Sequence, residues 1–229
     1  NLISPTFFAN SSTGNKYSLW VNVYGVSERY LNVYGEKDLR AQMNQFFHRT
    51  YTHPVDGTTL DMKMLCNWYW YDETAILETG KGTKDWNFYR YAETLLSAAE
   101  AIAQSSGVNA EAAGYLAQVK ARANMEGKDV STIASELQRL GKQAFIEECW
   151  KERLREFPLE MKIWDDCVRT GKFPQISATN KGEVQFVDLI GAKNGSGATF
   201  KATDLYWPIP VNEIQRNPNL TQNEGYSAK

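Results

Sequence analysis

Four aromatic side chains follow one another directly after Asn67, and they are the first residues of this chain that could act on a ligand. Aromatic rings are flat and amphipathic, so exposed rings can stack on the apolar C–H faces of a sugar. If the run is extended, Trp68 and Trp70 share one face while Tyr69 and Tyr71 share the other. The run therefore predicts a ligand surface, with Asn67 and nearby acids bonding hydroxyl groups. Packing into the core is the alternative for each ring.

Aromatic residues are abundant throughout the chain, which holds seven Trp, twelve Tyr and ten Phe among 229 residues. Trp20 stands in the alternating segment Leu19–Tyr24 and is a further candidate for the ligand surface. Aromatic side chains also build cores, so burial is again the alternative. A sugar held by ring stacking and hydroxyl hydrogen bonds needs no cofactor, and we expect none.

A recurring glutamate is the pattern closest to acid–base chemistry, at Glu148, Glu152, Glu156 and Glu160. Two carboxylates can hydrolyse a glycosidic bond, but they must stand on opposite sides of it. Residues four apart lie on one face of a helix and cannot flank a bond in this way. We therefore interpret these glutamates as a charged helix face beside an apolar stripe, neutralised by Lys151, Arg153, Arg155 and Lys162.

Other catalytic and metal-binding patterns are absent from the sequence. It contains no Gly-x-Ser-x-Gly, no phosphate-binding glycine loop before a helix and no CxxC, and it has only two histidines. Cys66 is one of three cysteines; Cys149 and Cys167 lie among apolar neighbours in helical patterns and are expected to be buried free thiols. We therefore predict no catalytic residues, no metal site and no enzyme activity.

The overall composition is that of an ordinary globular protein. Apolar residues make up 42% and charged residues 23%, with a formal net charge of −2. This lack of basic excess argues against a nucleic-acid partner. No stretch approaches the roughly 18–20 apolar residues that span a bilayer.

The helical patterns fall in the middle of the chain. An alanine- and leucine-rich period predicts a helix over Phe88–Gln104, ended by Ser105–Gly107. Asn109 is a suitable N-cap for a second helix over Ala110–Ala123. Two such helices joined by a short turn form an antiparallel hairpin, the shape of one tetratricopeptide (TPR) unit.

A third helix is predicted from Ser131 or Thr132 to Phe157, resuming over Glu160–Thr170 because Pro158 interrupts it. One continuous apolar stripe follows both parts: Trp150, Leu154, Phe157, Met161, Trp164 and Val168. Beyond Gly171 the chain is polar and glycine-rich, with a strand-like run at Glu183–Ile190.

The last residues carry three prolines and several large apolar side chains. Pro208 and Pro210 favour an extended backbone before a short turn at Val211–Ile214, and Asn217–Asn219 is typical of a further turn. We expect this tail to be clamped onto the helical body by Tyr206, Trp207, Ile209, Leu220 and Tyr226.

Several of these segments resemble motifs of the SusD/RagB family. The tail 205–226 resembles its ending "LWPIP..EI..NPNLTQN.GY". Arg90–Ala101 is similar to its "RYAEvLLmyAEA" helix, and Leu116–Ala123 to "LNqVRaRAG". Glu152–Asp166 resembles "ERRrELaFEGhRWfDL", and Asp38–Arg40 echoes an upstream "DpR". The motifs occur in the family's order.

Three positions in the Glu152–Asp166 motif depart from the family pattern. Met161 stands where the family has Gly, Ile163 where it has Arg, and Pro158 where it has Ala. The motifs themselves are architectural, since Arg/Glu pairs and Trp rings within helices hold a fold together. The ligand surface is therefore expected in the variable loops.

The resemblance implies a mainly α-helical fold with TPR-type helix pairs, long irregular loops and few short strands. We expect a loop-rich segment over 1–87, a helical core over 88–170 and a loop with a clamped tail over 171–229. The chain would be the C-terminal portion of a larger protein whose N-terminal half carries most TPR pairs. Apolar surface left exposed by the absent helices is a further expectation.

The family also implies a function. Its members are surface lipoproteins of Bacteroidetes outer membranes, anchored by an N-terminal lipidated cysteine, whereas all cysteines here are internal. They bind glycans, or in some members peptides, and cover a SusC-like TonB-dependent transporter. The resemblance thus implies a non-catalytic nutrient-binding protein, here for an oligosaccharide such as a starch-like glycan. A helical-repeat scaffold for a protein partner is the alternative from another class, and a peptide-binding member of the family is a third possibility.

Overall fold

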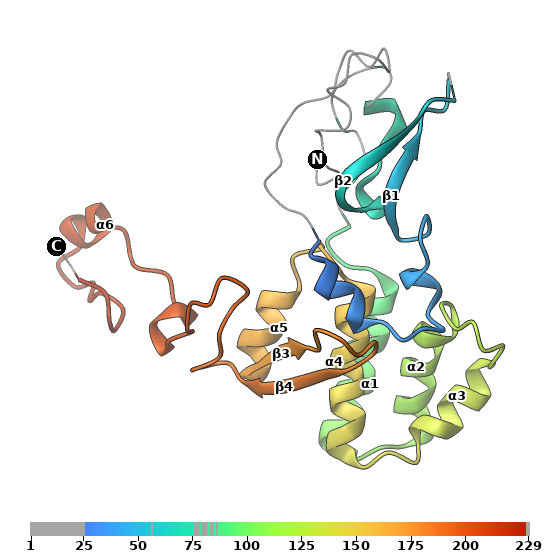
Figure 1. The fold of residues 1–229 in the computed structure, drawn as a ribbon. Helices are drawn as coiled ribbons and strands as arrows, with labels where there is room; N and C mark the ends of the chain where they lie inside the picture. Colours follow the sequence, from blue (N-terminus) through green and yellow to red (C-terminus); the bar gives the residue numbers. More distant parts are fainter. Residues whose placement is uncertain are drawn as a thin grey trace. The chain divides into compact units, whose positions relative to one another are not determined.

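The structure, a computed structural model, describes residues 26–55, 57–75, 78, 82, 85 and 87–227. It is mainly helical with few short strands, as the sequence predicts (Figure 1). The chain divides into two compact units, which are described separately. The larger unit comprises Asn1–Ile163 with Ile176–Gln185, and the smaller one Trp164–Gln175 with Phe186–Lys229. The strand Leu19–Tyr24 expected from the sequence lies outside the described residues.

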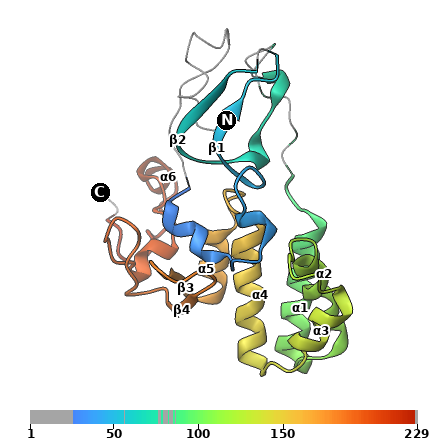
Figure 2. The same ribbon diagram turned by 45° about the vertical axis from the view of Figure 1, so that its right-hand side comes forward.

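Four helices build the core of the larger unit: α1 (Tyr91–Ser106), α2 (Ala110–Ala121), α3 (Val130–Leu137) and α4 (Lys142–Glu156). Figure 2 shows α4 alongside α1, with α2 and α3 on the other side of α1. Alanines and leucines of α1 and α2 pack against Phe145 and Ile146 of α4. Small side chains let the helices approach closely, and the larger ones fill the space between them.

The hairpin of α1 and α2 follows the prediction. Gly107 ends α1 in a positive-φ conformation (φ 83°) that side-chain-bearing residues avoid. Asn109 then caps α2, where its Oδ1 accepts a hydrogen bond from the backbone N–H of Ala112 at 2.9 Å.

The predicted third helix is two helices, so that prediction was wrong. α3 is capped by Asp129 and ends at Leu137, and α4 begins only after Gly141, whose backbone is extended. Ile133 on α3 and Phe145 on α4 enter the same core. The turn between them folds the chain back, while the apolar period continues through it and hides the break.

The break at Pro158 is where the sequence places it, since α4 ends at Glu156 and α5 spans Ile163–Thr170. The continuous apolar stripe is not present. Leu154 and Phe157 are buried, but Met161 is 61% exposed. Met161 has a left-handed backbone (φ 61°), so the chain turns away here and the period no longer faces the core.

Before α1, the larger unit contains an antiparallel hairpin of β1 (Phe47–Thr52) and β2 (Thr59–Asn67). Three short 3-10 helices accompany it: η2 (Glu28–Val33), η3 (Leu39–Ala41) and η4 (Trp68–Trp70). The hydroxyl groups of Tyr30 and Tyr34 donate to backbone carbonyls of α4 at 2.6 and 2.9 Å. These bonds attach the segment expected to be irregular to the helical core.

The smaller unit contains most of α5, most of β3 (Lys172–Ile176), the end of β4 (Val184–Asp188), which pairs with β3, and also η6 (Ala202–Leu205) and α6 (Val211–Arg216). β4 confirms the strand-like run, whereas β3 was expected to be loop. Phe200 packs on Trp164 and Phe173, with ring centroids 5.7 and 5.2 Å apart. These rings are only partly buried, with Trp164 40% exposed, and the buried residues of the unit include Cys167, Leu189 and Ala192.

The tail forms turns of its own within the smaller unit. The hydroxyl of Tyr226 donates to the carbonyls of Thr203 and Tyr206, each at 2.9 Å. Gln222 bonds both the N–H and the carbonyl of Ile209. The Asn217–Asn219 turn is present, with a 3.0 Å bond between those residues. Clamping onto the helical body stays a prediction.

Candidate functional site

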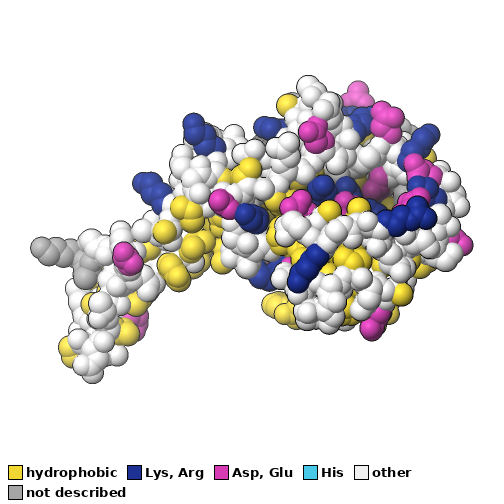
Figure 3. Space-filling model, turned by 90° about the horizontal axis from the view of Figure 1, so that it is seen from below, with side chains coloured by type: hydrophobic (Ala, Val, Ile, Leu, Met, Phe, Trp, Pro, Cys, Tyr) yellow, Lys and Arg dark blue, Asp and Glu magenta, His cyan; other side chains and the backbone are white. Residues whose placement is uncertain are grey.

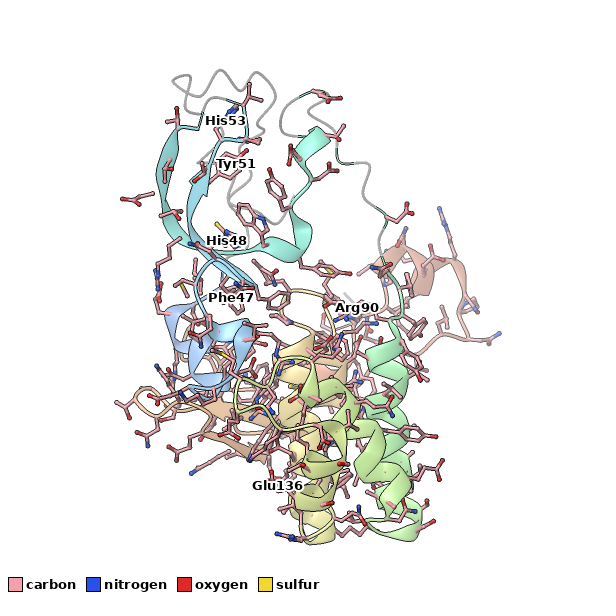
Figure 4. The ribbon with its side chains drawn as sticks, turned by 90° about the vertical axis from the view of Figure 1, so that its right-hand side faces the viewer. Phe47, His48, Tyr51, His53, Arg90 and Glu136 are labelled. Carbon is pink, nitrogen blue, oxygen red and sulfur yellow. The ribbon has the colours of Figure 1, made fainter. Side chains whose placement is uncertain are left out.

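Four rings from the β1–β2 hairpin and the following 3-10 helix form the candidate site. We call His48, Tyr51, Trp68 and Tyr71 the aromatic cluster. Figure 4 shows His48 and Tyr51 along β1, with His53 just beyond its end. The cluster includes two residues of the aromatic run singled out in the sequence and two from β1.

The aromatic run is not extended, so the predicted alternation of its side chains was wrong. β2 ends at Asn67, whose Oδ1 accepts a hydrogen bond from the N–H of Tyr69 at 2.8 Å and opens η4. A 3-10 helix has 3.0 residues per turn, which places residues three apart on one side. Trp68 and Tyr71 therefore stack in parallel, with centroids 4.5 Å apart and an angle of 10°.

His48 supplies another parallel stack on Trp68, at 3.8 Å and 13°. Tyr51 contacts both Trp68 and Tyr71, at 6.0 and 6.1 Å. The register of the hairpin shifts between His48 and Thr50. Such an irregularity changes the direction in which side chains point. His48 and Tyr51, three residues apart on β1, therefore both reach the indole of Trp68.

The cluster is uncharged near neutral pH. Burial lowers the pKa of His48, against hydrogen bonds to backbone that act to raise it. Burial also raises the pKa of Tyr71 above its ordinary range, and the neighbouring Tyr51 and Glu73 act in the same direction. His48, Trp68 and Tyr71 are half-buried and Tyr51 is buried, and neutral rings with polar edges match a neutral, hydroxyl-rich ligand better than a charged one.

The structure corrects the assignment of Asn67 to the ligand surface. Its side chain is fully buried, and its Nδ2 donates to the carbonyl of Pro158 at 3.1 Å. With its Oδ1 bonded to Tyr69, both ends of the amide are used within the protein. Asn67 therefore positions the aromatic run and is not exposed to a ligand.

The other predicted ligand residues have different surroundings. Tyr69 is half-buried, with Arg90 over its ring at 5.7 Å and its hydroxyl accepting from Asn87 at 3.0 Å. The side chain of Trp70 and all of Trp20 lie outside the described part of the structure. His48 and Tyr51 were not predicted as ligand residues from the sequence. The aromatic and histidine residues concentrated in 46–53 could have indicated them.

Below the cluster, the four regularly spaced glutamates Glu148, Glu152, Glu156 and Glu160 belong to a largely buried ion-pair network that spans several elements. We use this name for Asp38, Arg40, Arg90, Lys120, Arg122, Glu148, Glu152, Arg155, Glu156 and Glu160. The structural role expected for the glutamates agrees with this arrangement. Glu152, Glu156 and Glu160 are only 1–7% exposed, so the charged face predicted beside the apolar stripe is buried within the protein.

Most cations of the network come from outside α4. Arg90, at the start of α1, binds Glu160 through Nε and Nη2 at 2.9 and 2.7 Å and Glu156 through Nη1 at 2.9 Å. The predicted partners Arg153 and Lys162 pair with Glu93 of α1 instead. Buried carboxylates need such partners, and only tertiary contacts supply enough of them.

The pKa shifts in the network oppose a catalytic role. Burial acts to raise the pKa of Glu152, but the charges of Arg40, Lys120 and Arg155 outweigh it and lower the pKa to about 2. The pKa of Glu148 is lowered by Lys120 and Arg155, again against burial. A general acid in glycoside hydrolysis needs a raised pKa, so these carboxylates are suited to holding structure.

All three cysteines are buried and none forms a disulfide, as predicted for Cys149 and Cys167. Burial raises the pKa of both thiols, to about 11 for Cys167. Across the described residues, no three His, Cys, Asp or Glu side chains are arranged to hold a metal ion. None of the helices there has the length and apolar character needed to cross a membrane.

Comparison with known proteins gives a consistent result. The model of the SusD family matches residues 11–226. The chain is 36% identical over 138 residues to a protein of Bacteroides thetaiotaomicron named "Starch-binding protein SusD". That match covers 60% of this chain and 21% of the relative.

A solved structure has the same fold. It is a SusD superfamily protein from Parabacteroides distasonis, which aligns with a TM-score of 0.78 and 28% identity over 97% of this chain. The alignment covers 46% of that protein. The chain therefore spans less than half the length of either relative.

Proposed function

This chain belongs to the SusD family, and we propose that it is part of a non-catalytic protein that binds oligosaccharides at the cell surface. The observation that carries the proposal is its 36% identity to a protein named for starch binding. The aromatic cluster supports it, because uncharged rings with polar edges suit a neutral glycan.

The proposed binding surface is made of the side chains at the outer edge of the cluster. Trp68 is stacked on His48 and Tyr71, which fixes its orientation and leaves its edge for the ligand. Tyr69 and Tyr71 bring hydroxyl groups, and that of Tyr71 lies 3.5 Å from Glu73. Sugar hydroxyls would bond these polar groups while C–H groups of the sugar contact the exposed ring edges. Trp70 and Trp20 stay proposed contributors.

We further propose capture and hand-over as the mechanism. The full-length protein would be a surface lipoprotein of the outer membrane, with its lipid anchor outside this chain. It would hold the glycan above a SusC-like TonB-dependent transporter and release it into the transport path. Binding requires no bond to be made or broken, so neither a cofactor nor an acid–base pair is needed.

Binding of a protein or peptide partner is the second candidate. The observation that favours it is an exposed aromatic group before and at the start of α1: Phe88, Tyr89 and Tyr91 are 72–75% exposed. Large exposed rings are typical of interaction surfaces. In a longer protein the same rings could instead contact the N-terminal half, as expected for apolar surface left uncovered in this chain.

Calorimetric titration with maltoheptaose tests the first proposal, using an equally long β-linked glucan and a short peptide as comparisons. We expect saturable binding of a glycan, and unchanged oligosaccharide length after overnight incubation. Peptide binding without glycan binding would favour the second candidate. Shortened oligosaccharides would contradict the non-catalytic role.

A further inference from the structure

A charged cavity of about 370 Å³ lies in the larger unit, and it shares no residue with the aromatic cluster. Its walls come from the segment 35–40, the end of α2 with the following turn, α3 and α4. Pockets that hold small molecules start at about 300 Å³, so the volume admits a sugar unit. Ala123 and Ile133 are the apolar residues among its described walls, and ten of the fourteen lining residues are charged.

The lining of the cavity is balanced in charge. Five acidic residues, Glu36, Asp38, Glu126, Glu136 and Glu152, face five basic ones, Lys37, Arg40, Lys120, Lys128 and Arg155. On the rim, Lys128 pairs with Glu126 and with Glu136 of α3, each at 2.9 Å; Glu136 is labelled in Figure 4. Acidic and basic side chains are likewise interspersed on the surface in Figure 3. A balanced lining gives no net attraction for a simple anion or cation.

Deep in the cavity, Arg155 retains donors that the protein does not use. Its Nε donates to the carbonyl of Val33 at 3.0 Å, and its Nη1 serves Glu148 and Glu152. The Nη2 group of Arg155 makes no hydrogen bond to a described residue. It is also not one of the fully buried polar atoms without a partner. These donors are therefore open to the cavity or its water.

Glu152 and Arg40 hold this inner wall in place. Glu152 is 1% exposed and its Oε1 lies 2.9 Å from Nη1 of Arg40, which also binds Asp38. Arg40 neutralises Glu152, and Arg155 offsets Asp38, so this wall presents a fixed array of donors and acceptors without net charge. A hydroxyl both donates and accepts a hydrogen bond, so a molecule with several hydroxyls satisfies such an array.

We propose that this cavity binds a neutral, hydroxyl-rich molecule of the size of a mono- or disaccharide. The hydroxyls of the ligand would accept from Nη2 of Arg155 and from rim ammonium groups such as Lys37. They would donate to carboxylate oxygens of the rim, such as those of Glu36. The site is separate from the aromatic cluster and does not depend on the function proposed for that cluster.

Gly35 offers a way to block the cavity without disturbing its charges. It lines the cavity, a Cβ added there would meet no atom within 4 Å, and its backbone is not left-handed. Gly35→Leu therefore places an apolar side chain in the open space. Gly195→Leu is the matched control, because a Cβ there is equally free and Gly195 is not part of the cavity.

The test is an NMR titration of the ¹⁵N-labelled full chain with glucose, maltose and, separately, inorganic phosphate. We expect the sugars to shift the Nε–H signals of Arg40 and Arg155 and the amide of Lys37 in a saturable manner. Gly35→Leu should weaken this response at least tenfold, while Gly195→Leu leaves it unchanged.

Three outcomes would overturn the proposal: no shift at any sugar concentration, shifts that persist in Gly35→Leu, or a stronger response to phosphate than to sugar.

Lys37→Met is a second variant that leaves the buried network intact, and it should weaken sugar binding severalfold. The amides of Trp68 and Tyr71 report the aromatic cluster in the same spectra. Failure of one site is therefore distinguishable from failure of the other.

Discussion

Arg40 places Nη1 2.9 Å from Oε1 of Glu152, which joins a short 3-10 helix to the middle of α4. The carboxylate is 1% exposed, and the guanidinium is held from its other side by Asp38 at 2.7 Å. The family-like motifs at 38–40, 90–101, 116–123 and 152–166 each contribute residues to the network around this pair. Motifs far apart in the sequence are therefore parts of one buried structure.

Replacing Glu152 should destabilise the protein strongly. Glu152→Gln leaves Arg40, Lys120 and Arg155 without their shared buried anion, and loss of one partner of a buried pair costs about 3–5 kcal/mol. Urea unfolding followed by circular dichroism measures this change. Glu147→Gln, on the same helix but bonded to Gln143, is the control and should cost less than about 0.5 kcal/mol. Equal effects of the two variants would contradict the role given to Glu152.

The same pair predicts how stability depends on pH. The pKa of Glu152 is lowered in the folded protein to about 2 from an ordinary value of 4.5. A carboxylate whose pKa is lowered on folding stabilises the folded protein fully at a pH above its ordinary pKa. This stabilisation by Glu152 is lost as the pH falls from about 4.5 towards about 2. Thermal melts across this range should show the loss. Glu152→Gln should reduce the slope, and an unchanged slope would contradict the assignment.

Asn67 and Tyr71 should affect different properties. Asn67→Ala removes a buried amide bonded to Tyr69 and Pro158, so it should cost about 1–3 kcal/mol of stability. Tyr71→Ala removes an aromatic contact worth about 0.5–1.5 kcal/mol, so glycan affinity should fall about two- to tenfold. Calorimetry and thermal melts separate the two effects. Tyr115→Ala on α2, outside the cluster, should leave affinity unchanged.

Met161 should be replaceable by glycine with a gain in stability. Its left-handed backbone (φ 61°) costs a residue with a Cβ about 1–2 kcal/mol, and its side chain is 61% exposed, so little packing is lost. After the entropy cost of glycine, Met161→Gly should stabilise the protein by up to about 1 kcal/mol. Met125→Gly, 47% exposed and without a positive φ, should instead destabilise it. A stability loss in Met161→Gly would show that the turn is not strained.

Truncation after Thr203 should lower the melting temperature markedly, because it removes the bonds of Tyr226 and Gln222 together with the expected clamp on the helical body. Gly225→Ala is a milder variant, since its Cβ would lie 2.1 Å from Cγ2 of Thr203 at a φ of 85°. It should lower the melting temperature by a smaller amount. A truncated protein as stable as the parent would contradict a clamping role for the tail.

Local signals were enough to predict much of the helical core. The Asn109 cap, the glycine after α1 and the break at Pro158 each depend on neighbouring residues, so the sequence determines them directly. The turn before α4 was missed because the apolar period continues through it. The stripe beyond Phe157 was wrong because the positive φ of Met161 turns the chain away.

The sequence by itself thus determined most of the helices, the Asn109 cap and the family of this protein, since these depend on residue type and short-range spacing. Tertiary structure decided what the charged and aromatic side chains do. It paired the glutamates of α4 with cations from other elements, and the cost of burying a charge makes those partners necessary. It also buried Asn67 and brought His48 onto Trp68, contacts set by strand pairing and not by sequence proximity.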